Sequence, residues 1–149
     1  MQILKKKLTG VIGMTAAAVA AGVLTMPGQA HAAEAAFWSV DCDKVAAPGD
    51  PGAHNLSARI WRTAEPGKSA LAHFQGGPET LSLSNRAGAM MHFTLQWTNA
   101  AGNRIERAWE LHLGSGETRN EDFNIPEGRT VYVSVGTPGG STAYCNGKS

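Results

Sequence analysis

The sequence has few of the features that would assign a catalytic or nucleic-acid-binding function. Its 149 residues include only 2 Cys and 17% charged residues, and 13 Lys and Arg nearly balance 12 Asp and Glu. The formal net charge of +1 provides no strongly basic surface, so we expect no nucleic-acid partner. With 42% hydrophobic residues the chain is too apolar for a disordered tail. Its 18 Gly and 7 Pro follow no collagen-like period, which leaves a single folded domain.

Motifs of the common enzyme classes are also missing. The chain has no G-x-S-x-G elbow, no H-E-x-x-H helix, no P-loop and no glycine-rich dinucleotide turn. Gly114-Ser-Gly116 continues as Glu-Thr-Arg, which is typical of a turn, and Asp41-Cys-Asp43 lacks the other ligands of a calcium loop. These absences favour a non-enzymatic protein that needs no cofactor.

The first 32 residues have the pattern of a cleaved secretory signal peptide. Lys5-Lys7 form a positive segment, an apolar stretch runs from about residue 8 to 26, and Ala30-His31-Ala32 offers small residues at the cleavage site. Cleavage leaves residues 33–149 as one domain and removes three Lys and no acid, which lowers the net charge from +1 to −2. The alternative is an uncleaved N-terminal anchor, because the apolar stretch is close to spanning length.

The remaining chain has the properties of a secreted, extracellular protein. No second apolar stretch is long enough to span a bilayer, so we expect no stable membrane insertion after cleavage. In an oxidising compartment the two cysteines, Cys42 and Cys145, predict one disulfide. It would clamp the two ends of the domain, and closing so long a loop stabilises the fold by at most about 4–5 kcal/mol.

Alternation of apolar and polar residues recurs after residue 32, whereas helical periodicity is nearly absent. Segments rich in Gly and Pro separate the alternating stretches. Seven to nine short strands at this spacing predict an all-β fold, an antiparallel β-sandwich or a small barrel. The expected strands are residues 37–42, 56–63, 70–74, 80–84, 91–97, 105–113, 118–123, 131–135 and 142–145.

In its size and in the rhythm of its turns this domain resembles an immunoglobulin-like sandwich. The resemblance is restricted to those two properties. The chain lacks the spacing of the buried tryptophan and the inter-sheet disulfide that characterise that family.

One hairpin can be specified in more detail. Residues 98–104 fit a three-residue loop, Ala100-Ala101-Gly102, with Gly102 in the left-handed conformation. Alternation points Arg107 toward the apolar face, which suggests a sheet edge or a buried acidic partner. The predicted cross-strand pairs are Trp97–Ile105, Phe93–Trp109 and Met91–Leu111 on the apolar face, with Gln96–Glu106 and His92–Glu110 on the polar face.

Two groups of residues are candidates for a functional site. The first is His92, Glu110 and His112, which share the polar face of this hairpin and could bind a metal or transfer protons. Ordinary polar pairing on a solvated sheet face is the alternative. Two other histidines, His54 and His73, have no potential partner residue nearby in the sequence, so we expect them at the surface.

The second group consists of Trp61 and Tyr132, which alternation places on the polar sides of their strands. Aromatic side chains on such a face can stack on sugar rings or anchor a partner protein. The alternative is that each covers apolar surface beneath a loop or in the second layer of the sandwich.

These observations favour a non-catalytic binding module of a bacterial exoprotein. Its ligand would be a cell-surface, glycan or protein target. A secreted inhibitor or toxin that acts on an external protein or membrane is the first alternative. A small metal-dependent hydrolase that uses His92, Glu110 and His112 is the second.

Overall fold

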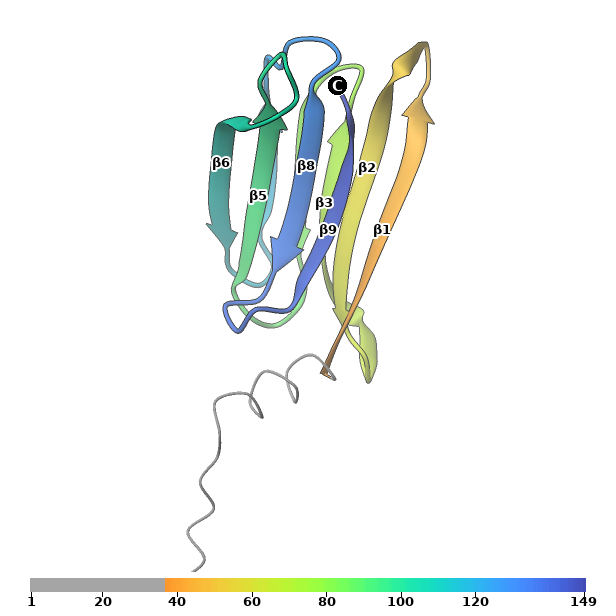
Figure 1. Ribbon diagram of the computed structural model, residues 1–149. Coiled ribbons are helices and arrows are strands. Elements are labelled where there is room, and N and C mark those ends of the chain that lie inside the picture. The colour runs from red at the N-terminus through yellow and green to blue at the C-terminus, as the bar shows by residue number, and fades with distance from the viewer. Residues whose placement is uncertain (1–36) are drawn as a thin grey trace, which may run out of the picture.

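The computed structural model describes residues 37–149, which form two antiparallel β-sheets packed face to face (Figure 1). The predicted signal peptide, residues 1–32, lies outside the described residues. No helix within the described range is long and apolar enough to cross a membrane. The strands are β1 (Trp38–Ala47), β2 (Asp50–Arg62), β3 (Glu65–Gln75), β4 (Thr80–Asn85), β5 (Met91–Thr98), β6 (Ile105–Leu113), β7 (Thr118–Asp122), β8 (Thr130–Gly136) and β9 (Thr142–Lys148).

The predicted antiparallel β-sandwich is confirmed. One sheet has five strands in the order β1-β2-β3-β4-β7, and the other has four in the order β6-β5-β8-β9. The sheets are separate, so the small-barrel alternative is wrong. Strands β1 and β9 lie along one side of the sandwich, while β6 and β7 are the sheet edges on the opposite side (Figure 1).

The core lies between the sheets and follows from the alternation of the strands. Leu56 and Ile60 of β2, Phe74 of β3, and Phe93 and Leu95 of β5 are fully buried. Each is separated from the next inward residue of its strand by a residue that points outward, as the period of two requires. Residues that face outward are therefore free to build a binding surface.

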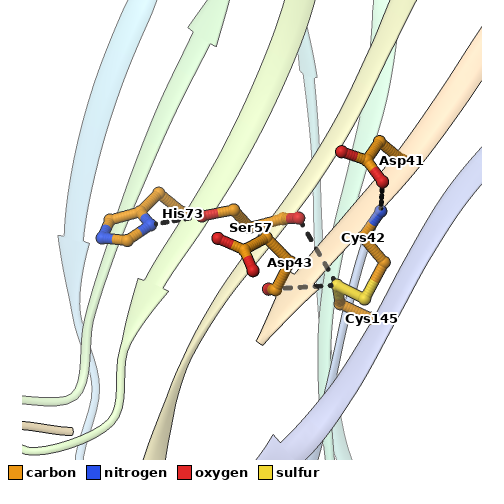
Figure 2. The surroundings of a disulfide bond; sticks show 6 residues. All are labelled: Asp41, Cys42, Asp43, Ser57, His73 and Cys145. Carbon is orange, nitrogen blue, oxygen red and sulfur yellow. Dashed lines mark hydrogen bonds between the residues drawn. A yellow bond between two sulfur atoms is a disulfide. The ribbon is translucent and has the colours of Figure 1, made fainter. Parts of the chain in front are cut away.

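The predicted disulfide between Cys42 and Cys145 is present, with its two Cα atoms 5.3 Å apart. It joins β1, an edge of the five-stranded sheet, to β9, an edge of the four-stranded sheet (Figure 2). The bond therefore closes one side of the sandwich and ties the first strand to the last, as the sequence predicted.

The predicted register of the hairpin between β5 and β6 is wrong by two residues. The observed pairs are Met91–Leu113, His92–His112, Phe93–Leu111, Thr94–Glu110, Leu95–Trp109, Gln96–Ala108 and Trp97–Arg107. They replace the expected Trp97–Ile105, Phe93–Trp109, Met91–Leu111, Gln96–Glu106 and His92–Glu110. A shift of two preserves the face of each side chain but changes every partner.

The cause is a longer connection than the sequence predicted. Gly102 does adopt a positive φ of 70°, but β5 ends at Thr98 and β6 begins only at Ile105. The Asn99 N–H donates to the Arg104 carbonyl oxygen at 3.0 Å, and the Asn99 and Asn103 side chains bond to each other at 2.9 Å. The register also shifts between Trp97 and Thr98, where the pairing is irregular.

Candidate ligand-binding face

The outer face of the four-stranded sheet carries a cluster of aromatic, amide and hydroxyl side chains. Register places Tyr132 of β8 between Gln96 of β5 and Asn146 of β9. In the next row, Ser134 of β8 lies between Thr94 of β5 and Tyr144 of β9. We call this surface the tyrosine face; it comprises Thr94, Gln96, Tyr132, Ser134, Tyr144 and Asn146.

The two tyrosines of this face are in contact. Their ring centroids lie 5.8 Å apart and their planes are inclined by 26°. Tyr144 is 53% exposed, whereas Tyr132 is half-buried. The pair therefore combines a fixed aromatic group with an accessible one, which suits a surface for stacking contacts.

The phenol of Tyr144 remains protonated over a wider pH range than a free tyrosine. Partial burial raises the pKa of Tyr144, and the neighbouring Tyr132 raises it further. A hydrogen bond with the Asn146 side chain acts in the opposite direction and lowers this pKa. Because the net shift is upward from 10.0, the hydroxyl is a neutral donor and acceptor at neutral pH.

The hydroxyl groups beside the tyrosines are held by the sheet itself. Thr94 Oγ1 and Ser134 Oγ lie 2.6 Å apart on adjacent strands, within hydrogen-bond distance. Gln96 and Asn146 flank Tyr132 on either side and contribute amide groups that both donate and accept. The face thus offers neutral hydrogen-bonding groups around two aromatic rings.

Trp61, the other aromatic candidate, lies elsewhere on the molecule. It belongs to β2, between Ser39 of β1 and Ser69 of β3 on the outer face of the five-stranded sheet. The Arg59 guanidinium lies 5.1 Å from its ring centroid, so a cation already occupies one side of the indole. Trp61 and Tyr132 therefore do not form one patch.

The sequence prediction missed Tyr144 as the neighbour of Tyr132. A usable signal exists, because Tyr144 lies between Ala143 and Cys145, which are both buried. Alternation alone would have placed Tyr144 on the outer face of its strand. Its contact with Tyr132 needs the pairing of β8 with β9, which alternation does not specify.

The histidine candidates lie on the same outer face, near the end of β6. His92 and His112 are directly opposite each other, with stacked rings whose centroids are 4.5 Å apart. Glu110 is one step along β6, and its Oε2 atom lies 3.6 Å from His92 Nε2. All three share the polar face, as predicted. Residues 37–149 contain no group of three or more His, Cys, Asp or Glu side chains suited to hold a metal ion.

The two histidines that the sequence left without partners have them in the structure. His73 Nδ1 lies 2.8 Å from Ser57 Oγ across β2 and β3 (Figure 2), and His54 Nδ1 accepts the Lys148 N–H at 3.2 Å. Asp43 of β1 is paired with Ser57 on the other side, so the serine lies in the middle of the row. A serine hydrolase needs the histidine in that middle position, and this row therefore does not fit that chemistry.

A shallow groove lies at the open side of the sandwich. It encloses about 290 Å³ and is lined by Leu111, His112, Leu113, Glu117, Thr118 and Arg119. Arg119 is paired with Glu121, whose carboxylate lies 3.6 Å away. Its mixed charges and its small volume do not specify a ligand.

Comparisons of the chain with protein-family models, with curated proteins and with solved structures found no match. The tyrosine face is the surface on which aromatic rings and neutral hydrogen-bonding groups are brought together by register.

Proposed function

We propose that this chain is a secreted, non-catalytic binding module that holds a cell-surface glycan on its tyrosine face. The observation that supports the proposal is the contact between Tyr132 and the exposed Tyr144 on the outer face of the four-stranded sheet. The module would act outside the cell, in keeping with the signal-peptide pattern of residues 1–32 and with the Cys42–Cys145 disulfide.

A glycan suits this surface for chemical reasons. The C–H faces of a sugar ring are apolar and pack on aromatic rings, while its hydroxyls need neutral donors and acceptors around those rings. Gln96 and Asn146 supply amides next to Tyr132, and Thr94 and Ser134 supply hydroxyls next to Tyr144. Tyrosine also loses little conformational entropy on binding, because only two side-chain angles need to be fixed.

The position of these side chains on paired strands favours a binding site, because the strands hold them in place before a ligand arrives. Tyr132 and its neighbours lie on β5, β8 and β9, three strands that hydrogen-bond to one another. A site on rigid strands is preorganised, so little free energy is spent in ordering it when a ligand binds. A saccharide chain lying across the strands would contact both rows of the tyrosine face.

A retention assay tests the proposal. Purified protein is mixed with insoluble cell-wall material, chitin or cellulose, and the bound fraction is measured for wild type, Tyr132→Ala and Tyr144→Ala. We expect wild type to be retained on at least one of these polymers and Tyr144→Ala to bind about tenfold more weakly or worse. Trp61→Ala is the matched control, because it removes an aromatic ring from the opposite sheet.

The pattern of loss identifies the surface that binds. Equal retention of wild type and both tyrosine variants would contradict the proposal, and selective loss in Trp61→Ala would move the site to the five-stranded sheet. Failure of folded wild-type protein to bind any polymer would favour a soluble protein target, the inhibitor or toxin class. Circular dichroism of each variant shows whether it is folded.

A further inference from the structure

We infer that the tyrosine face selects a glycan of N-acetylated amino sugars over a plain glucan. The inference rests on the proposed function, because it names the chemical class of glycan that the same surface would hold. It starts from the row of side chains that contains Tyr132. Register sets Gln96 of β5 on one side of Tyr132 and Asn146 of β9 on the other.

Gln96 carries an amide whose hydrogen-bonding groups the protein does not use. Its side chain is half-buried, and within residues 37–149 it has no hydrogen-bond partner. The amide atoms still reach solvent, since the unpartnered side-chain atoms that are screened from solvent in this range belong to other residues. A ligand on this face therefore meets an amide that can both donate and accept.

The amide of Asn146 is oriented by the neighbouring tyrosine. A hydrogen bond joins the Asn146 side chain to Tyr144 and lowers the pKa of that phenol. A bond with this effect is donated by the amide nitrogen, because it stabilises the charged form of the phenol. The amide oxygen of Asn146 is then left to accept a hydrogen bond from a ligand.

An acetamido group matches the two amides better than a sugar hydroxyl does. Its N–H and C=O point in opposite directions, because the amide is planar and trans. Gln96 and Asn146 lie two strand spacings apart, or about 9.6 Å along the hydrogen-bonding direction. One peptide group in a middle strand bridges the same span between its two neighbours. A hydroxyl donates and accepts through a single oxygen atom, so it spans a shorter gap.

An acetamido group placed over the Tyr132 ring therefore has a partner at each end. Its N–H donates to the Asn146 amide oxygen, and its C=O accepts from the Gln96 amide nitrogen. The sugar ring that carries this group would lie toward the exposed Tyr144, in the next row.

The charges around this row favour a neutral sugar over an anionic one. The row itself has no charged member, and Glu110 lies in the adjacent row, paired with Thr94. On the other side, the Lys148 ammonium already donates to the Gly128 carbonyl oxygen at 3.2 Å and to the Thr130 hydroxyl at 3.0 Å. A carboxylate on the glycan would meet the negative charge of Glu110 and a lysine that is already engaged.

Calorimetric titration of the folded protein with two oligosaccharides of equal length tests the inference. A chitin oligomer and a cellulose oligomer share their linkage and differ only in the acetamido group. We expect wild type to bind the chitin oligomer about tenfold more tightly, the effect of one or two additional hydrogen bonds.

Variants of the amide residues locate the source of this preference. Gln96→Leu removes an amide but keeps the size of the side chain, and should reduce the preference to about threefold or less while binding of the cellulose oligomer is unchanged. Asn146→Leu should act in the same direction. Gln75→Leu, on the outer face of the five-stranded sheet, is the matched control and should bind both oligomers like wild type.

Several results would overturn the inference and leave the proposed function standing. They are equal affinity for the two oligomers, tighter binding of the cellulose oligomer, and a preference that both Gln96→Leu and Asn146→Leu leave intact. Retention on cell-wall material without binding of either oligomer would overturn it as well. The proposed function fails instead, and the inference with it, when folded wild type is retained on no polymer and binds neither oligomer.

Discussion

Asn85 shows how one residue can stabilise an irregular part of this fold. It is fully buried, and its side-chain amide makes three hydrogen bonds to the backbone. Its Nδ2 donates to the carbonyl oxygens of Ala89 and Leu113 at 2.8 Å each, and its Oδ1 accepts the Ala87 N–H at 2.9 Å. These bonds tie the connection between the two sheets to the end of β6.

Removal of this side chain should therefore destabilise the protein. We expect Asn85→Ala to lower the free energy of unfolding by about 2–4 kcal/mol, because it leaves buried backbone groups without partners. Urea denaturation measures the change. Asn124→Ala, at an exposed position, is the control and should change stability by less than about 0.5 kcal/mol. Equal effects of the two substitutions would contradict the role given to Asn85.

Gly76, directly after β3, lies against the backbone of the neighbouring strand β2. A Cβ atom at this position would lie 2.6 Å from the His54 carbonyl oxygen and 2.9 Å from the His54 nitrogen. The Gly76 N–H also donates to Asn55 Oδ1 at 3.1 Å. Its lack of a side chain therefore allows β3 to end against the backbone of β2.

A pair of adjacent glycines provides a direct test. We expect Gly76→Ala to lower the free energy of unfolding by about 2–3 kcal/mol, because backbone atoms must move to admit the methyl group. Gly77→Ala should change it by no more than about 0.5 kcal/mol, since nothing lies within 4 Å of a Cβ there. Thermal and urea denaturation measure the stability of both variants. Equal stabilities of Gly76→Ala and Gly77→Ala would contradict the close approach inferred at Gly76.

Strand β6 has an edge that a second chain could extend. Trp109 and Leu111 on its inner side are only partly buried against the core, and Arg107 on the same side is exposed. An inward-pointing charge on an edge strand opposes pairing with another strand, because pairing would bury that charge. The position of Arg107 at a sheet edge agrees with one of the two explanations that its sequence pattern suggested.

Replacement of this charge should allow the edge strand β6 to pair with a second copy of the chain. We expect Arg107→Val to associate into dimers or larger species at concentrations where wild type does not change its mass. Sedimentation velocity measures the difference. Arg104→Val, in the connection before β6, removes the same charge and should behave like wild type. Association of both variants to the same extent would show that net charge, and not the edge, is responsible.

At the scale of the whole molecule, the Cys42–Cys145 bond holds together one side of the sandwich. We expect reduction, or the double substitution Cys42→Ser and Cys145→Ser, to lower the free energy of unfolding by up to about 4–5 kcal/mol. The reason is that a loop spanning 103 residues is no longer closed in the unfolded chain. Thermal denaturation with and without reductant measures this, and labelling of the native protein should detect no free thiol.

Much of the fold could be predicted because the evidence for it is local. Buried Leu56, Ala58 and Ile60 alternate with residues that are not buried, and this period of two distinguishes a strand from a helix without any knowledge of its partners. The disulfide could be predicted for a similar reason, since two cysteines allow only one intramolecular pair. Outward placement of Tyr132 and His92 also followed from alternation.

The partners of those residues could not be predicted from the same pattern. His112, and not Glu110, faces His92, because six residues between β5 and β6 set a register that differs from the three-residue loop. A shift of two leaves alternation unchanged, so the sequence pattern is equally compatible with both registers.

Alternation along the chain therefore determined the all-β class and the side of each strand that is buried, because both depend on residues close in sequence. The presence of only two cysteines determined the disulfide, because one intramolecular pairing is possible. The order and register of the strands are tertiary properties set by loops and by packing between sheets. They alone decided that Tyr132 meets Tyr144, that His92 stacks on His112, and that Trp61 lies on the opposite face of the molecule.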